Sequence, residues 1–343
     1  MTMGFTVENP GVLTTIQDEG RYGYEQFGMS PAGPMDGKAF HTGNILVGNP
    51  WGESALEATV LGPTLCFDQD AVIAVTGADM APKLNGAPCP MYRAVAVRRG
   101  DRLQLGAAKA GCRAYIAFAG GLDVPQVMGS RATALQNQVG GYQGRKLAKG
   151  DSIALRAPQT PLEDLSGRVA PPPKAQKREV AVRVILGPQD DAFTREGLDT
   201  FLHQPYTVSK DFDRMGCRLE GPEIAHKTDG NIISDGMATG AIQVPTSGQP
   251  IIMLAERQTV GGYTKIATVI SADLPVVGQC KTGDILRFQA VTVAEAHRLL
   301  KEQDRELRDL QACVERPSPP QTGSAYRVTV NGTVYYVSVT RNN

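Results

Sequence analysis

The chain has 343 residues, which is long enough for two domains, each with its own core. Its 35 Lys and Arg residues balance its 35 Asp and Glu residues, so no overall charge attracts nucleic acid or an anionic membrane. No apolar run reaches the roughly 18 residues of a membrane span, and residues 1–11 lack the pattern of a secretory signal. We therefore expect a soluble, cytoplasmic protein without nucleic-acid or membrane partners.

The six cysteines are scattered, with no C-x-x-C pair and no histidine at the spacing of a metal ligand. We expect them to be small buried side chains in a reducing compartment, and we predict no metal site. A structural disulfide or a catalytic thiol is the alternative.

Short apolar runs bounded by Gly, Pro or Asp predict a mostly-β protein. They occur at residues 71–77, 94–105 and 114–121, and again at 180–187, 240–245, 250–256 and 265–271. Regular spacing of this kind is typical of barrels or sandwiches.

A Gly-Asp pair precedes an alternating strand pattern three times, at residues 98–105, 148–155 and 281–288. Glycine supplies the positive φ of a tight turn, and the Asp side chain can accept hydrogen bonds from the turn backbone. The pattern is either a common strand-entry turn or the trace of a repeat in two related halves.

Helices are expected at 36–49, 190–202 and, most clearly, 292–315. Thr292 and Glu295 form a capping box for the third, and apolar residues then mark one packing face. This face comprises Val293, Ala296, Leu300, Leu307, Leu310 and Val314, with Gln303 as its polar interruption.

A proline-rich polar linker at 157–178 is the best domain boundary. We therefore predict an N-terminal lobe at 1–160, a C-terminal lobe at 179–290, a helix at 291–316 and a tail hairpin at 325–343. Asn331-Gly332 is the preferred two-residue hairpin turn of that tail.

The familiar motifs of self-contained ATPases, zinc hydrolases and serine hydrolases are missing. The sequence has no G-x-x-x-x-G-K-[ST], H-E-x-x-H or G-x-S-x-G, and it has only four histidines. Chemistry must therefore depend on other polar clusters.

The first such cluster is QDEGRYGYEQFG, in which Gln17, Asp18 and Arg21 alternate with glycines. Arg offers a planar fork for anions, and glycine lets a backbone approach a ligand closely. Asp18 and Arg21 either pair with each other as a structural salt bridge or bind a carboxylate, phosphate or amide.

Three further clusters lie in the second half. Asp213, Arg214 and Arg218 surround Gly216, and Gln243 stands between apolar strand residues, where a buried amide needs partners. The third cluster is a Gly-Gly pair among polar side chains, which suits either the close approach of a ligand or a plain hairpin turn. This cluster comprises Glu256, Gln258, Thr259, Gly261, Gly262, Tyr263 and Lys265.

Several ordered segments together resemble one family. They include TTIQDEGRYGYEQFGMSPAGPMD, VTGADMAPKLNG, AYIAFAGGLDVPQVMGSRAT, DRMGCRLEGPEI, IISDGMATGAIQVPTSGQPIIMLAERQTVGGYTKIATVISADL and TGDILRF, between about residues 5 and 290. The family contains the C subunit of ATP-dependent 5-oxoprolinase and the carboxyltransferase region of urea carboxylase, long called allophanate hydrolase subunit 2. It also includes the antagonist of a sporulation-kinase inhibitor.

The resemblance implies two lobes built on cyclophilin-like β-barrels with a ligand cleft between them. It also implies that polar residues of both halves face that cleft, namely Gln17, Asp18, Arg21, Asp213, Arg214, Arg218, Gln258, Thr259 and Lys265. The sequence departs from the family pattern Asp-x-Gln-Thr-Thr-Gly-Gly-Tyr-Pro at Glu256, Val260 and Thr264. These departures leave the detailed identity of the ligand open, but they do not affect the resemblance to the family.

The tail segment AYRVTVNGTVYYVSVT resembles the opening hairpin of a biotin carrier domain. No Met-Lys pair occurs in the sequence, so this chain cannot carry biotin in the usual way. The tail is either a relic or a strand that docks on a separate carrier.

The resemblance leaves three functions. The first is the C subunit of a 5-oxoprolinase, which uses ATP and Mg²⁺ in a site shared with the A and B subunits and is inactive without them. Here Arg21, Arg214, Arg218 and Lys265 would hold the substrate carboxylate and the transferred phosphoryl group, and Asp18 or Asp213 would orient water.

The second is a carboxyltransferase that takes carboxybiotin from another protein and acts on urea or a related amide. Gln243, Gln258 and the Gly261-Gly262 backbone would read ureido or amide groups, and Lys265 or an Arg would hold the carboxylate. The third is a non-catalytic module that binds a kinase inhibitor.

Overall fold

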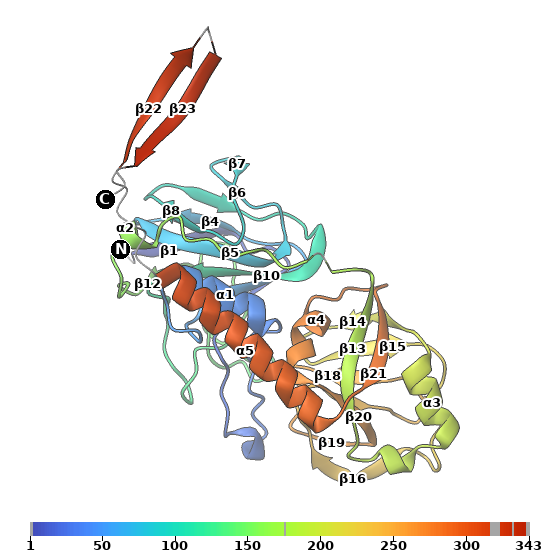
Figure 1. The fold of residues 1–343 in the computed structure, drawn as a ribbon. Helices are drawn as coiled ribbons and strands as arrows, with labels where there is room; N and C mark the ends of the chain where they lie inside the picture. The colour runs from blue at the N-terminus through green and yellow to red at the C-terminus, as the bar shows by residue number, and fades with distance from the viewer. Residues whose placement is uncertain (1–2, 175, 316–322, 331–332, 341–343) are drawn as a thin grey trace.

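The computed structural model describes residues 3–174, 176–315, 323–330 and 333–340. Strands dominate and helices are few, which confirms the mostly-β prediction (Figure 1). The strands fall into two groups along the chain, one before and one after the linker.

The N-terminal strands form two sheets that enclose the first core. Phe5 and Phe118 stack in this core with their ring centroids 4.9 Å apart. In sheet order, the seven-stranded sheet comprises β11 (Leu122–Asp123), β12 (Ser152–Leu155), β1 (Gly4–Asn9), β4 (Thr64–Phe67), β9 (Arg102–Gln104), β6 (Lys83–Leu84) and β7 (Ala87–Pro88). The five-stranded sheet comprises β2 (Leu13–Gln17), β3 (Ala55–Thr59), β10 (Ala110–Phe118), β5 (Ala71–Asp79) and β8 (Ala94–Val97).

The C-terminal strands form a closed seven-stranded barrel. Its first and last strands pair in parallel, from Glu179↔Ile285 to Val184↔Ala290, and this pairing helps to close the ring. The barrel order is β13 (Glu179–Leu186), β20 (Lys265–Val269), β17 (Ala241–Gln243), β18 (Ile251–Met253), β15 (Gly216–Glu220), β14 (Tyr206–Phe212) and β21 (Ile285–Ala290). A two-stranded ribbon, which we call the arm, consists of β16 (Asn231–Gly236) and β19 (Val260–Tyr263).

All three Gly-Asp pairs form the predicted turn. Gly100, Gly150 and Gly283 have φ values of 91°, 90° and 88°. In each turn the following Asp carboxylate accepts the N–H three residues earlier, at 2.8, 2.7 and 3.0 Å. The same local chemistry therefore starts β9 and β12 in the first half and β21 in the barrel.

The described helices are few. They are α1 (Gly37–Leu46), α2 (Leu162–Leu165), α3 (Arg195–His203), α4 (Leu274–Gly278) and α5 (Val293–Glu315), with 3-10 turns η1 (Glu25–Phe27), η2 (Asp190–Ala192) and η3 (Ser271–Asp273). Among the residues that the structure describes, no helix combines the length and apolar character needed to cross a bilayer.

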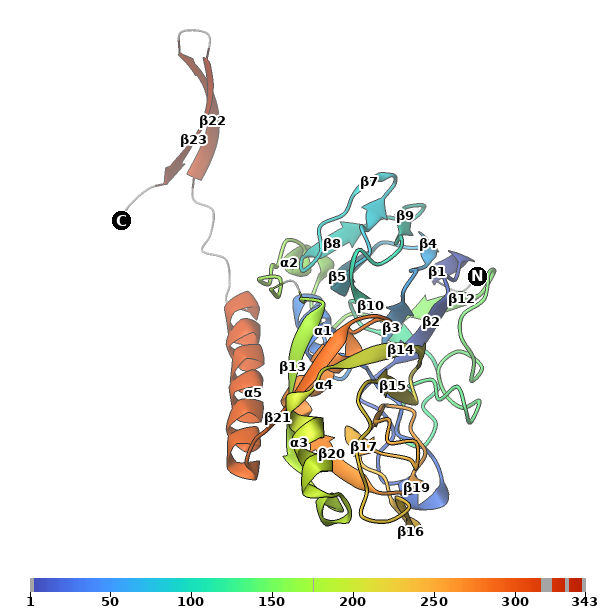
Figure 2. The same cartoon turned by 90° about the vertical axis from the view of Figure 1, so that its right-hand side faces the viewer.

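Helix α5 lies across both halves, against α1 and against η3 (Figures 1 and 2). The predicted Thr292 cap is present, because its hydroxyl accepts the Glu295 N–H at 3.2 Å. Ala296 and Leu307 are buried as expected, and Leu310 and Val314 are half-buried. Val293 and Leu300 instead are exposed, whereas Leu299 and Gln303 are half-buried. The inward face is thus rotated from the predicted one.

The tail forms an antiparallel pair of β22 (Gly323–Val330) and β23 (Thr333–Thr340), in register from Gly323↔Thr340 to Val330↔Thr333. The predicted Asn331-Gly332 turn lies outside the described residues.

Candidate functional site

The residues of the first polar cluster hold a neighbouring loop in place. Gln17 donates to the Thr133 carbonyl at 3.1 Å and accepts the Gly33 N–H at 3.0 Å. Asp18 accepts the Ser130 hydroxyl at 2.6 Å and also the N–H of Arg131. The motif therefore fixes residues 127–135, which are far away in the sequence.

Arg21 belongs to the same arrangement. Its Nε and Nη2 donate to the carbonyls of Val127 and Ala132 at 3.2 and 2.7 Å, and the side chain is only 1% exposed. Burial lowers the pKa of Arg21, and the charge of Asp18 opposes that effect. Asp18 and Arg21 form no ion pair within the described residues, because each is engaged with the loop instead.

A buried ion network joins the two halves of the molecule. Arg214 donates through Nε to Glu256 at 2.5 Å, through Nη1 to Glu57 of β3, and through Nη2 to the Gly33 carbonyl at 2.7 Å. The second oxygen of Glu256 accepts the N–H of Leu135 at 2.9 Å. Each of the three nitrogens of the Arg214 fork thus binds a protein oxygen, and these oxygens lie in both lobes.

Electrostatics keep this network charged despite its burial. Burial alone would raise the pKa of Glu57, but the nearby charges of Arg214 and Arg113 leave it below its ordinary value. Burial likewise opposes the charge on Arg214, but Glu57 and Glu256 raise its pKa overall. Tyr115 adds a further hydrogen bond to Glu57 at 2.7 Å.

A second set of bonds fixes the lobes next to this network. The Gln279 side chain accepts the Arg113 N–H at 3.0 Å and donates to Asp36 at 2.7 Å. Arg113 donates to the Gly278 carbonyl at 2.5 Å and stacks over the Phe212 ring at 4.7 Å. The Arg214 network and the bonds of Gln279 and Arg113 together fix the relative position of the two lobes, and each lobe contributes side chains to them.

Gln243 and Arg218 lie on the outer face of the barrel. Cys217, Ile252 and Ile242 pair across three strands and are fully buried in the core. Because side chains alternate along a strand, the next row, Arg218, Ile251 and Gln243, faces outward. Arg218 is exposed there, whereas Gln243 is only 2% exposed because other residues cover it.

The arm supplies that cover and creates a site with unused donors. A Cβ built on Gly261 would come within 2.3 Å of Gln243 Nε2 and 2.6 Å of the Met237 side chain, so glycine permits this approach. Arg257 donates through Nε to the Met237 carbonyl at 2.7 Å. Within the described part of the chain, the buried Gln243 Nε2 and Arg257 Nη1 have no hydrogen-bond partner. Two unused donors beside Met237 are suited to a ligand with oxygen acceptors.

The loop that contains η1 approaches the same region. Burial lowers the pKa of Arg257, and the charges of Glu25 and Tyr22 oppose the shift. Tyr22 and Phe27 are 65% and 76% exposed. Figure 2 shows the η1 loop and the arm at one end of the molecule.

Lys265 is buried against the arm. It is 2% exposed, and its Nζ donates to Asp235 at 2.7 Å, whereas Asp235 itself reaches solvent. The hydrogen bond from Lys265 holds the pKa of Asp235 below its ordinary value. Gln189 accepts the Lys265 N–H at 3.1 Å and fixes the strand.

The remaining predicted residues are more exposed. Asp213 accepts the N–H groups of Met215 and Gly216 at 2.7 and 3.1 Å, and so shapes the β14–β15 turn. Gln258 and Tyr263 are exposed, and Thr259 and Gly262 are half-buried in and beside β19.

The structure therefore divides the predicted residues into groups. Gln243, Gly261 and Lys265 meet at the arm, whereas Gln17, Asp18 and Arg21 fix the 127–135 loop. Two contributors were missed, Glu57 and Arg257. Glu57 had a signal, because it interrupts the apolar strand run ALEATV in the same way that Gln243 interrupts GAIQVP.

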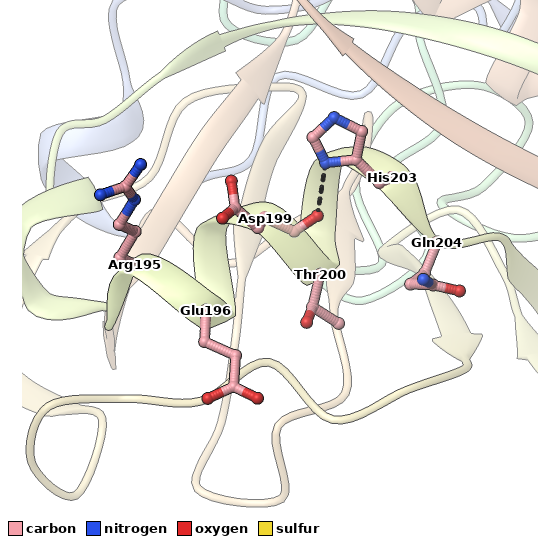
Figure 3. Close-up of a pocket in the computed structure, with 6 residues that line it drawn as sticks. All are labelled: Arg195, Glu196, Asp199, Thr200, His203 and Gln204. Carbon is pink, nitrogen blue, oxygen red and sulfur yellow. Dashed lines mark hydrogen bonds between the residues drawn. The ribbon is translucent and has the colours of Figure 1, made fainter.

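Two surface cavities lie elsewhere. The larger, about 540 Å³, lies along α3, and its lining side chains all project from that helix or its end (Figure 3). No opposing wall converges on it, and His203 is bonded to the Asp199 carbonyl at 2.8 Å. The second, about 440 Å³, lies where the linker enters the barrel. No described group of His, Cys, Asp and Glu side chains is arranged to hold a metal ion.

Comparison with known proteins places this geometry in a family. The chain is 36% identical over 301 residues to the 5-oxoprolinase C subunit of Haemophilus influenzae, covering 88% of this chain and 96% of that protein. It is 36% identical over 328 residues to urea amidolyase of Lachancea kluyveri, covering 90% of this chain but only 18% of that longer protein.

The structure of Kluyveromyces lactis urea carboxylase superposes with a TM-score of 0.86 at 30% identity, covering 99% of this chain and 33% of that one. The family described as carboxyltransferase domain, subdomain A and B, matches residues 27–290. The predicted resemblance is therefore confirmed, and the chain belongs to this carboxyltransferase-domain family.

Proposed function

We propose that this chain is the C subunit of an ATP-dependent 5-oxoprolinase that acts together with the A and B subunits. The observation that carries the proposal is the pair of buried, unused donors at Gln243 Nε2 and Arg257 Nη1. The relative from Haemophilus influenzae that bears this name matches over nearly its whole length.

The two donors correspond to the two acceptors of 5-oxoproline. The neutral amide of Gln243 suits the lactam carbonyl, and the charged fork of Arg257 suits the carboxylate. Both residues are buried, so bonds to a ligand there compete weakly with water. Lys265, held by Asp235, adds a cation beside the same arm.

ATP, with its Mg²⁺, supplies the phosphoryl group that activates the lactam oxygen, and its site is completed by the partner proteins. Asp18 and Arg214 act as positioning residues in this proposal, because their polar atoms already bind protein groups. They hold the 127–135 loop and the lobes against the arm.

The test is a reconstituted complex of the chain with homologues of the A and B subunits. Conversion of 5-oxoproline to glutamate should require ATP and all three chains. Gln243→Met removes the amide and keeps the volume, and it should raise KM by about ten- to a hundredfold, the equivalent of one lost hydrogen bond in a buried site.

Gln249→Met is the matched control. Gln249 accepts the Gly221 N–H at 2.9 Å and donates to the Gly221 carbonyl at 3.0 Å, so both its amide oxygen and its amide nitrogen already bind the protein, unlike Gln243 Nε2. We expect its KM to be unchanged. No turnover by a correctly assembled complex, or turnover by this chain alone, would refute the assignment.

Carboxyl transfer is the second candidate. It is favoured by the match to urea amidolyase and by the fit of the Gln243 amide to a ureido carbonyl. Carboxybiotin on another protein would then be the donor, and urea or a related amide the acceptor. Urea-dependent loss of label from a ¹⁴C-carboxybiotin carrier, catalysed by this chain, distinguishes it. If neither reaction occurs and the arm variants still bind a protein partner normally, a non-catalytic binding role gains support.

A further inference from the structure

Four of the nine residues that line the second cavity are basic. Lys109, Lys177, Arg178 and Lys281 surround about 440 Å³, a volume within the range of small-molecule sites. Within the described residues, none of these four cations forms an ion pair with Asp or Glu. In a chain with no net charge, this is a local excess of positive charge.

The lining contains a single carboxylate, that of Asp284. Asp284 is 5% exposed, and its Oδ2 accepts the Lys281 N–H at 3.0 Å, as the strand-entry turn requires. Its one negative charge against the four cations leaves the lining with an excess of three positive charges.

Three separate segments build the site and fix it. Lys109 precedes β10, Lys177 and Arg178 precede β13, and Lys281 follows α4. Gln176 anchors the linker by donating to the Val276 carbonyl at 3.1 Å, and Arg178 donates to the Gly283 carbonyl at 3.3 Å.

The lobe junction forms part of the lining. A Cβ on Gly111, whose φ is +73°, would come within 2.7 Å of Gln279 Oε1, so the two segments meet here only because residue 111 is glycine. Gln279 Oε1 is bonded to the N–H groups of Cys112 and Arg113 at 2.9 and 3.0 Å. The cations therefore project from a fixed base that involves both lobes.

This pocket shares no lining residue with the arm, and it also lies away from the Gln17–Arg21 cluster. On the five-stranded sheet, Gln17 pairs with Ala55 at one end of β3, and Arg113 pairs with Thr59 at the other. Lys109 lies beyond the Thr59 end, so it is at the opposite edge from Asp18.

We propose that this pocket binds a small polyanion that carries two or more phosphate groups. Cations from three segments suit several charged oxygens at once, and no aromatic side chain lines the pocket to stack on a base. Recognition is therefore through the phosphates, and an inorganic polyphosphate should bind about as well as a nucleoside triphosphate.

The test is isothermal titration calorimetry, in which the isolated full chain is titrated with inorganic tripolyphosphate and with ATP. Each titration is made at about 0.01 M and at about 0.15 M ionic strength. Binding should weaken with salt, and the double variant Lys109→Glu with Lys281→Glu should lose at least about tenfold in affinity for both ligands. The matched control is Lys83→Glu with Lys149→Glu, two exposed lysines outside the pocket, with the same change in net charge.

Equal loss in both double variants would show general charge attraction and overturn the proposal. Absence of binding to the wild-type chain at low salt would also overturn it, as would tighter binding of an acidic peptide than of tripolyphosphate. A milder pair, Lys109→Gln with Lys281→Gln, checks that any loss is not a folding defect, since it should reduce affinity without changing the thermal midpoint. The measurement needs no turnover, so its failure is independent of the 5-oxoprolinase assignment.

Discussion

Replacing Arg214 by Met should destabilise the protein by about 3–5 kcal/mol, the usual cost of removing one partner from a buried ion pair. Met retains much of the side-chain volume, so the loss is electrostatic. Glu57 would keep Arg113, whose Nε is 3.9 Å away, as its remaining paired cation, together with the bonds from Tyr115 and the Met35 N–H. Glu256 would keep the Leu135 N–H. Because two buried carboxylates lose their cation together, we expect the upper part of that range.

The assay is urea unfolding followed by far-UV circular dichroism, with Arg218→Met as the matched control. Arg218 is an exposed arginine four residues along the chain, so its replacement should change the free energy of unfolding by less than about 0.5 kcal/mol. Adding Glu57→Gln to Arg214→Met neutralises one stranded carboxylate, and the double variant should lose less than the sum of the singles. If Arg214→Met lowered the free energy of unfolding by less than about 1 kcal/mol, the conclusion that this network holds the two lobes together would be refuted.

Three further outcomes follow from the same contacts. Glu57 has a folded-state pKa below its ordinary 4.5, so it stabilises the fold above that pH, and the stability disappears as pH falls through the folded pKa. The Glu57→Gln variant should therefore be less stable than the wild type at pH 7. Its urea midpoint should fall less than that of the wild type between about pH 5 and pH 3, and an equal fall in the two proteins would contradict this. Gly261→Ala should displace the Gln243 amide and raise KM in the reconstituted assay, whereas Gly236→Ala, with nothing within 4 Å of its Cβ, should not; equal KM values would exclude a role for that approach. Gln311→Ala removes the acceptor of the Trp51 indole N–H at 2.7 Å, so the chain's single tryptophan should shift its emission to the red, with a stability loss of about 0.5–1.5 kcal/mol; unchanged emission would argue that α5 does not dock there.

Local chemistry was readable from the sequence, because it depends on residues a few positions apart. The Gly-Asp turns need only a positive φ and a carboxylate three residues from its donor, and all three formed as expected. The Thr292 cap of α5 is local in the same way. The family also followed from the order of its segments.

The inward face of α5 shows where local reasoning stops. The apolar spacing favoured Leu300, yet Leu299 and Gln303 lie closer to the protein. The rotation of the helix is determined by its partners on α1 and Trp51, through contacts such as the Lys38–Glu306 pair at 2.6 Å. Those partners are more than 250 residues away in the sequence, so no periodicity within the helix reports them.

The sequence by itself determined which residues were polar, glycine-flanked and worth attention, but only the tertiary structure decided what each one binds. Arg214 stands beside Asp213 in the chain, yet its carboxylate partners are Glu256, 42 positions away, and Glu57, 157 positions away. Asp18 and Arg21 stand three apart and bind a loop more than 100 residues further on instead of each other. The physical reason is that a buried polar group must find partners wherever the fold brings them. The unused donors of Gln243 and Arg257, which lie together beside Met237, can be recognised only once every other bond is in place.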